Sequence, residues 1–222
     1  MGAISIENTE RLFWLGRYSE RVFTTVKAFT GSYDAMIDFN EEGYKDFCAT
    51  LEIPMVYSDR NDFLSRYMFS LEDPNSLYSN LSRAYDNAIV LREEIGSESL
   101  SHVQMAMYAM AKAEKSDAPL LEIQEVLDHI VAFWGTFDDI VEDEEVRSLI
   151  KLGKRVERID LYSRFRMPSS ALEREVHRLK GRIQKVSIPY NQFFLEEMEI
   201  MASMPFIDYQ GLLFRIDNLF VS

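Results

Sequence analysis

The stretch LGRYSERV at residues 15–22 has a near copy, LGKRVERI, at residues 152–159. Both follow the pattern Leu-Gly-basic-x-x-Glu-Arg and lie where the apolar residues have the period of an α-helix. A glycine inside a helix costs up to about 1 kcal/mol relative to alanine. Two matching glycines therefore indicate that another backbone packs closely against each of them, because glycine has no Cβ to prevent it.

The repeat predicts a pseudo-symmetric pair of helices. A glutamate four residues after each glycine lies on the glycine's face of the helix. We therefore expect Glu20 to pair with Arg158 in a partly buried interface. The reciprocal pair is Glu157 with Arg21. Two interpretations stay open, since the pairs either fix the register of the two helices or line a polar cleft.

A cleft of this kind would bind an anion, because planar guanidinium groups suit a carboxylate or a phosphate. The glutamates would orient the basic groups. If the protein is an enzyme, Glu20 and Glu157 are instead the candidate general bases for a reaction on an amide or peptide. The candidate ligand-binding residues are Arg17, Glu20, Arg21, Lys154, Glu157 and Arg158.

The helical period extends along most of the chain, and no alternating apolar and polar run predicts a strand. Caps, glycines and prolines mark the expected helix ends: Asp73 as a cap and Pro74 in the first turn begin one helix, and Gly96 ends it. We predict an all-α fold, a single domain over residues 1–222 that forms a bundle of eight or nine helices. The main expected helices occupy residues 8–38, 74–95, 97–115, 119–141, 145–167 and 171–187, with shorter ones at 43–53, at 59–71 and near the C-terminus.

The charge is strongly acidic and unevenly distributed. A net charge of −13 argues against nucleic-acid binding, which needs a basic surface. Residues 147–185 nevertheless carry twelve basic and four acidic side chains, a net charge of +8, so the remainder carries −21. The two parts either neutralise one another within the protein, or the basic segment forms a groove for a phosphate or an acidic partner.

Several classes of protein are disfavoured. No apolar run reaches the length of about 18 residues that spans a membrane, and no secretory signal is visible, so we expect a cytoplasmic protein. The single cysteine, Cys48, fits a reducing compartment and is expected in the core rather than as a nucleophile. The Glu-x-x-His motif of di-iron bundles and the glycine-rich nucleotide loops are absent, so we expect neither a metal nor a cofactor.

Four segments together resemble a known family, the bacterial alpha-E family, which is named for a Glu-Arg motif in a helical domain. Residues 7–21 (ENTERLFWLGRYSER) resemble its opening signature, and residues 152–158 resemble its later Leu-Gly-Arg-x-x-Glu-Arg element. Between them, residues 73–77 (DPNSL) and 84–88 (AYDNA) are similar to two further elements. Members of the family are longer, and residues 168–222 contain no copy of the helical pattern of their C-terminal half.

The resemblance implies partners rather than a reaction. Genes of this family tend to lie beside those of a circularly permuted ATP-grasp ligase and a transglutaminase-like peptidase. The first hypothesis is a non-catalytic partner or substrate-holding component of a peptide- or amide-forming system, with an anionic small molecule or peptide as ligand. An enzyme and a purely structural interaction protein are the alternatives, and the aromatic C-terminal segment makes a homodimer plausible.

Overall fold

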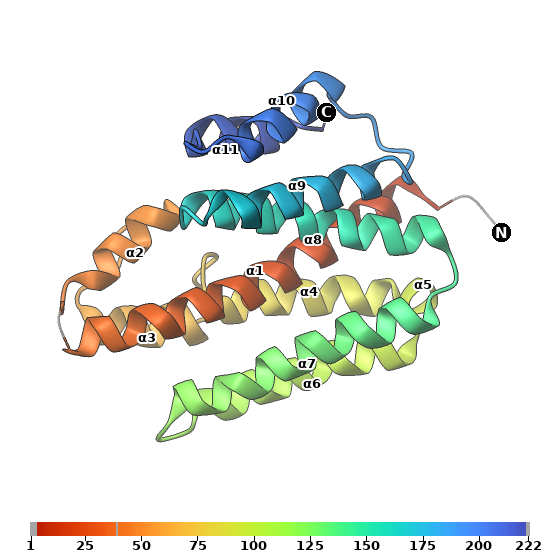
Figure 1. Ribbon diagram of the computed structural model, residues 1–222. Helices are drawn as coiled ribbons and strands as arrows, with labels where there is room; N and C mark the ends of the chain where they lie inside the picture. Colours follow the sequence, from red (N-terminus) through yellow and green to blue (C-terminus); the bar gives the residue numbers. More distant parts are fainter. Residues whose placement is uncertain (1–3, 39, 221–222) are drawn as a thin grey trace. The chain divides into compact units, whose positions relative to one another are not determined.

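The computed structural model describes residues 4–38 and 40–220, and the side chains of these residues outside 32–38. The chain divides into two compact units (Figure 1). Unit 1 comprises residues 1–17 and 143–222, and unit 2 comprises residues 18–142. The prediction of a single domain stays a prediction.

The all-α class is confirmed. Over the described ranges the chain forms eleven helices rather than eight or nine, and its β-structure is an isolated bridge between Tyr190 and Phe220. The helices are α1 (Ile6–Asp38), α2 (Gly43–Leu51), α3 (Arg60–Phe69), α4 (Leu77–Val90), α5 (Arg92–Ile95), α6 (Ser97–Glu114), α7 (Pro119–Ile140), α8 (Glu144–Arg164), α9 (Ser169–Ile183), α10 (Gln192–Ser203) and α11 (Tyr209–Asp217).

The helix expected at residues 74–95 differs most from the prediction. It is divided at Leu91 into α4 and α5, and it begins three residues later than the Asp-Pro pair indicated. The cap is Ser76, whose side chain accepts a hydrogen bond from the Ser79 backbone amide. Asp73 instead accepts a hydrogen bond from the Tyr57 hydroxyl at 2.7 Å. The Asp-Pro pair therefore belongs to the turn before the helix.

Aromatic rings make up one end of the unit 2 core. Phe63 of α3 is fully buried and stacks on Tyr67, with 5.1 Å between the ring centroids. Rings from α1 and α2 reach it as well, since Phe29 and Phe47 lie 6.1 and 6.0 Å from Phe63. Offset and edge-to-face pairs of this kind stabilise a core beyond the area they bury. Helices α1, α2 and α3 therefore pack together around the ring of Phe63.

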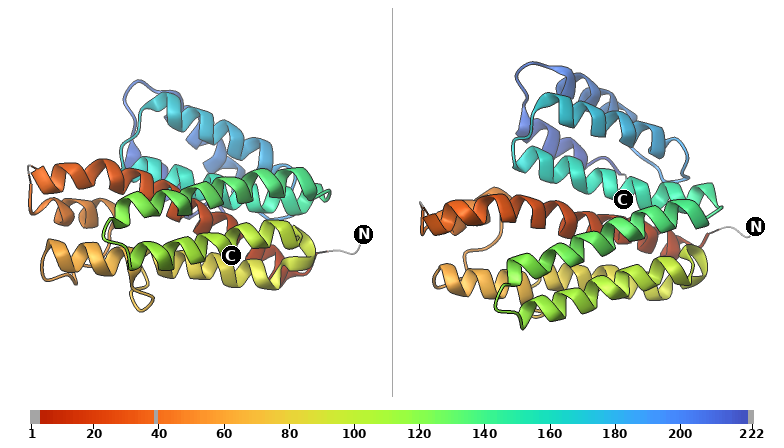
Figure 2. Two further views of the ribbon diagram at one scale, coloured as in Figure 1. Left: turned by 90° about the horizontal axis from the view of Figure 1, so that it is seen from below. Right: turned by 60° about the horizontal axis from the view of Figure 1, so that its bottom comes forward.

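Helices α6 and α7 form an antiparallel hairpin, and both views in Figure 2 show them side by side. A short connection, residues 115–118, joins them, because Pro119 favours the first turn of a helix and begins α7 there. Gly96, at φ +80°, ends α5 and precedes α6, as the sequence predicts. Helix α4 packs on α6 and extends this layer.

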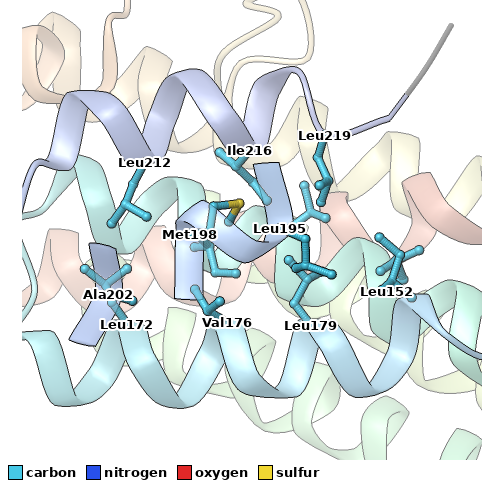
Figure 3. Close-up of a cluster of buried hydrophobic side chains, with 13 residues drawn as sticks. Leu152, Leu172, Val176, Leu179, Leu195, Met198, Ala202, Leu212, Ile216 and Leu219 are labelled. Atoms are coloured by element: carbon cyan, nitrogen blue, oxygen red, sulfur yellow. The ribbon is translucent and has the colours of Figure 1, made fainter. Parts of the chain in front are cut away.

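Unit 1 has a separate core among α8, α9, α10 and α11 (Figure 3). Met198 of α10 and Ile216 of α11 face Val176 of α9 in this core. The C-terminal helices therefore dock through one apolar face. Large apolar side chains of this segment that stay exposed are Phe193 and Ile200 of α10, Met204 and Phe206 after it, and Phe214 of α11.

The two repeated glycines lie where α1 crosses α8 within unit 1. A Cβ on Gly16 would lie closer than 3.0 Å to the carbonyl oxygen of Ile150, and a Cβ on Gly153 would lie equally close to that of Phe13. Real Cβ atoms essentially never approach another atom so closely. Each glycine therefore provides the space for the other helix's backbone.

This crossing predicts opposite effects of alanine at two kinds of helical glycine. Gly16→Ala or Gly153→Ala should lower the free energy of unfolding by about 2 kcal/mol, because the rigid carbonyls would have to move. Gly181→Ala is the control: no atom lies within 4 Å of its Cβ position. It should raise the free energy of unfolding by about 0.5–1 kcal/mol through helix propensity. Urea unfolding followed by circular dichroism measures all three, and equal effects at Gly153 and Gly181 would contradict the close crossing.

Candidate functional site

The α1–α8 crossing carries a buried ion pair. Arg17 of α1 donates a hydrogen bond from Nε to Oε2 of Glu157 on α8 at 2.7 Å. The Glu157 side chain is 0% exposed and that of Arg17 is 19% exposed. A carboxylate buried to this degree requires a charged hydrogen-bonding partner. Arg17 therefore stabilises the charge of Glu157.

Aromatic side chains orient Arg17. Trp14 and Phe13 precede it by three and four residues, so all three lie on neighbouring positions of α1. The guanidinium carbon lies 4.9 Å from the Trp14 ring centroid and 6.0 Å from that of Phe13. These cation–π contacts hold the guanidinium beside Glu157.

A second carboxylate follows one turn after Glu157 on α8. Asp160 is buried and accepts two hydrogen bonds from Arg164, at 2.9 and 3.2 Å. Burial raises the pKa of the Asp160 carboxyl, the bonds from Arg164 lower it, and the charge of Glu157 raises it again. The segment thus alternates carboxylates and guanidinium groups, which balances its buried charge.

The Glu20-Arg21 pair of the first copy lies in unit 2. Glu20 is fully buried and accepts a hydrogen bond from the Thr24 hydroxyl at 2.5 Å. Arg21 donates a hydrogen bond to the amide oxygen of Asn80 at 3.4 Å, and the amide nitrogen of Asn80 donates to the Ser76 backbone carbonyl at 2.7 Å. Arg21 therefore connects α1 with the cap of α4.

The six predicted site residues thus divide between the units. Arg17 and Glu157 are brought together, and Lys154 and Arg158 lie on the same helix as Glu157. The predicted pairs Glu20–Arg158 and Glu157–Arg21 would each join residues of different units, and they stay predictions. The assignment of these six residues to a ligand site also stays a prediction.

Sequence reasoning missed a larger cluster on α8 and α9. The buried carboxylate of Glu175 receives hydrogen bonds from Arg155 at 2.6 Å and from Arg178 at 2.8 Å. Two further guanidinium nitrogens lie within 4 Å of it, those of Arg158 at 3.8 Å and Arg174 at 3.9 Å. We call these five residues the Glu175 cluster. The excess of basic residues at 147–185 was the available signal, but the sequence does not indicate which acid they surround.

Residues 4–38 and 40–220 contain neither a candidate metal site nor an exposed cysteine nucleophile. No three His, Cys, Asp or Glu side chains of these residues are grouped as metal ligands. Cys48 is a buried residue of the unit 2 core, as expected. Burial raises the pKa of its thiol to about 11, and the nearby charge of Asp73 adds to the shift.

A model of a protein family matches most of the chain. The model named Alpha-E, described as a predicted alpha-helical domain with a conserved ER motif, matches residues 8–188. The chain belongs to the Alpha-E family. Both Glu-Arg pairs of the repeat lie within the matched range.

The match to Alpha-E extends beyond the residues that suggested it, to the end of α9, whereas α10 and α11 lie outside it. None of the curated proteins or solved structures compared with the chain matches it. In the part of this Alpha-E protein that the structure describes, no helix has the length and apolar character needed to cross a membrane.

The Arg17–Glu157 pair makes a prediction about stability. Arg17→Ala should lower the free energy of unfolding by about 3 kcal/mol, because it removes a direct partner of a buried carboxylate. The control is Lys185→Ala, which breaks an ion pair with Glu144 whose two side chains are about half exposed. Its effect should stay within about 0.5 kcal/mol. Chemical denaturation of both variants checks this, and similar small losses in the two would contradict a structural role for Arg17.

Cys48 makes a prediction about reactivity. A thiol with a pKa of about 11 is neutral at pH 8, and this one is also shielded from solvent. Since the thiolate is the nucleophile, native protein should resist iodoacetamide at pH 8, while urea-unfolded protein should be labelled completely. Mass spectrometry measures the labelled fraction. Comparable labelling rates in the native and unfolded states would show that Cys48 is accessible.

Proposed function

We propose that this Alpha-E protein is a non-catalytic component that holds an anionic group of a substrate or partner. It would serve a system that forms a peptide or amide product and includes an ATP-grasp ligase and a transglutaminase-like protein. Arg17, Lys154 and Arg158, which lie in unit 1, would bind the anion.

The exposure of the motif residues is the observation that carries this proposal. Glu20 and Glu157 are both fully buried. A general base must come within hydrogen-bonding distance of the proton it removes, and these carboxylates are occupied by Thr24 and Arg17. Base catalysis is therefore disfavoured at both positions.

The basic residues of the motif have the opposite character. The side chains of Arg17, Arg21, Lys154 and Arg158 are all intermediate in burial, so each keeps some accessible surface. Buried carboxylates that orient partly exposed cations suit the binding of an anion better than a proton transfer. The assignment of partners rests on the resemblance alone, which associates Alpha-E genes with ATP-grasp ligase genes.

Direct binding to an ATP-grasp ligase of the circularly permuted type that the resemblance associates with Alpha-E genes tests the proposal. Isothermal titration calorimetry should detect a complex in the micromolar range. Lys154→Gln should weaken it about tenfold, which corresponds to about 1.4 kcal/mol of binding free energy. The control Lys115→Gln removes an equal charge from the exposed end of α6 and should leave the affinity unchanged.

Two results would overturn the proposal. One is the absence of a complex at protein concentrations of about 100 μM, well above the dissociation constants typical of specific partners. The other is turnover of a peptide or amide by the isolated protein, abolished in a folded Glu157→Gln variant. That second result would instead support the enzyme alternative.

A further inference from the structure

The Glu175 cluster contains more positive charge than its carboxylate requires. Glu175 is 2% exposed, and one guanidinium would neutralise it. Arg155, Arg174 and Arg178 all lie within 4 Å of it. Arg158 also lies within 4 Å, at 3.8 Å, so the four arginines and the carboxylate of the cluster together carry a net charge of +3.

The guanidinium groups are held close together despite their mutual repulsion. Burial lowers the pKa of Arg155, the charge of Glu175 and its hydrogen bond raise it, and the charges of Arg158 and Arg178 lower it again, with a net lowering. Like charges assembled in a partly desolvated position are typical of binding sites for the opposite charge.

Two arginines of the cluster face solvent. Arg174 and Arg178 are four residues apart on α9 and so share one side of the helix. Their side chains are 56% and 47% exposed. Glu173 is two residues from Glu175, so the two carboxylates point to different sides of α9. The more buried Arg155 supports the two exposed groups from α8.

We propose that Arg174 and Arg178, positioned with Arg155 by the buried Glu175, form a binding site for a phosphate monoester. A phosphate monoester carries a charge of about −1.5 to −2 at pH 7 and three acceptor oxygens, which offsets most of the excess of +3. A single carboxylate would leave two positive charges without compensation. Arg155, Arg174 and Arg178 are not residues of the proposed anion site, which shares Arg158 with the cluster, and the phosphate site does not depend on an ATP-grasp partner.

Calorimetric titration with glycerol 3-phosphate, and with a peptide whose one charged group is a phosphoserine, tests the site at constant ionic strength. Both probes should bind, and the tighter one identifies the source of the phosphate as a small molecule or a peptide. Acetate should bind at least about tenfold more weakly, because it carries one charge. Binding of both phosphate probes no stronger than that of acetate overturns the proposal.

Variants identify the residues involved. Arg174→Gln with Arg178→Gln should weaken binding of the preferred phosphate probe at least about tenfold. Arg174→Gln alone leaves both hydrogen bonds to Glu175 intact, so it preserves the fold and should still weaken binding about threefold. The control Arg166→Gln removes one exposed charge of unit 1 outside the cluster and should leave the affinity unchanged. Equal affinities in the wild type, Arg174→Gln and Arg166→Gln overturn the assignment.

Discussion

The contact of α1 with α8 at Gly16 and Gly153 is the constraint on which unit 1 depends. With backbone against backbone, the side chains beside the crossing have fixed partners, and Arg17 meets Glu157. The buried charge of Glu157 then requires that α1 keep its register along α8, because a shift would separate the carboxylate from its guanidinium. Steric fit and electrostatics thus specify the same arrangement, and agreement between the two is what defines a single native structure.

Charge along α8 and α9 serves two different purposes. Asp160 and Arg164 form a balanced pair within α8, since one guanidinium group neutralises one carboxylate and no excess charge remains to bind a ligand. The Glu175 cluster is unbalanced, since several guanidinium groups surround one carboxylate. The buried Glu175 carboxylate therefore holds several guanidinium groups near one another.

The sequence predicts the helical class and most helix boundaries, since these follow from local periodicity and capping residues. It fails where tertiary contacts compete with local signals. Asp73 looked like a helix cap, but its carboxylate accepts a hydrogen bond from Tyr57, sixteen residues earlier, and Ser76 caps α4 instead. Glu175 was overlooked for a related reason. Arg178 is three residues after it on α9, but Arg155 is twenty residues before it, and only the packing of α8 on α9 brings Arg155 to Glu175.

The division of the chain within α1 has a consequence for the order of folding during synthesis. Residues 18–142 are contiguous, so the contacts of unit 2 can form as soon as this stretch leaves the ribosome. Gly16 must wait for Gly153, which is translated 137 residues later. At translation rates of about 5–20 residues per second, the first turns of α1 spend on the order of ten seconds without their partner helix. Apolar residues such as Leu12 and Leu15, fully buried in the finished protein, are exposed during that interval.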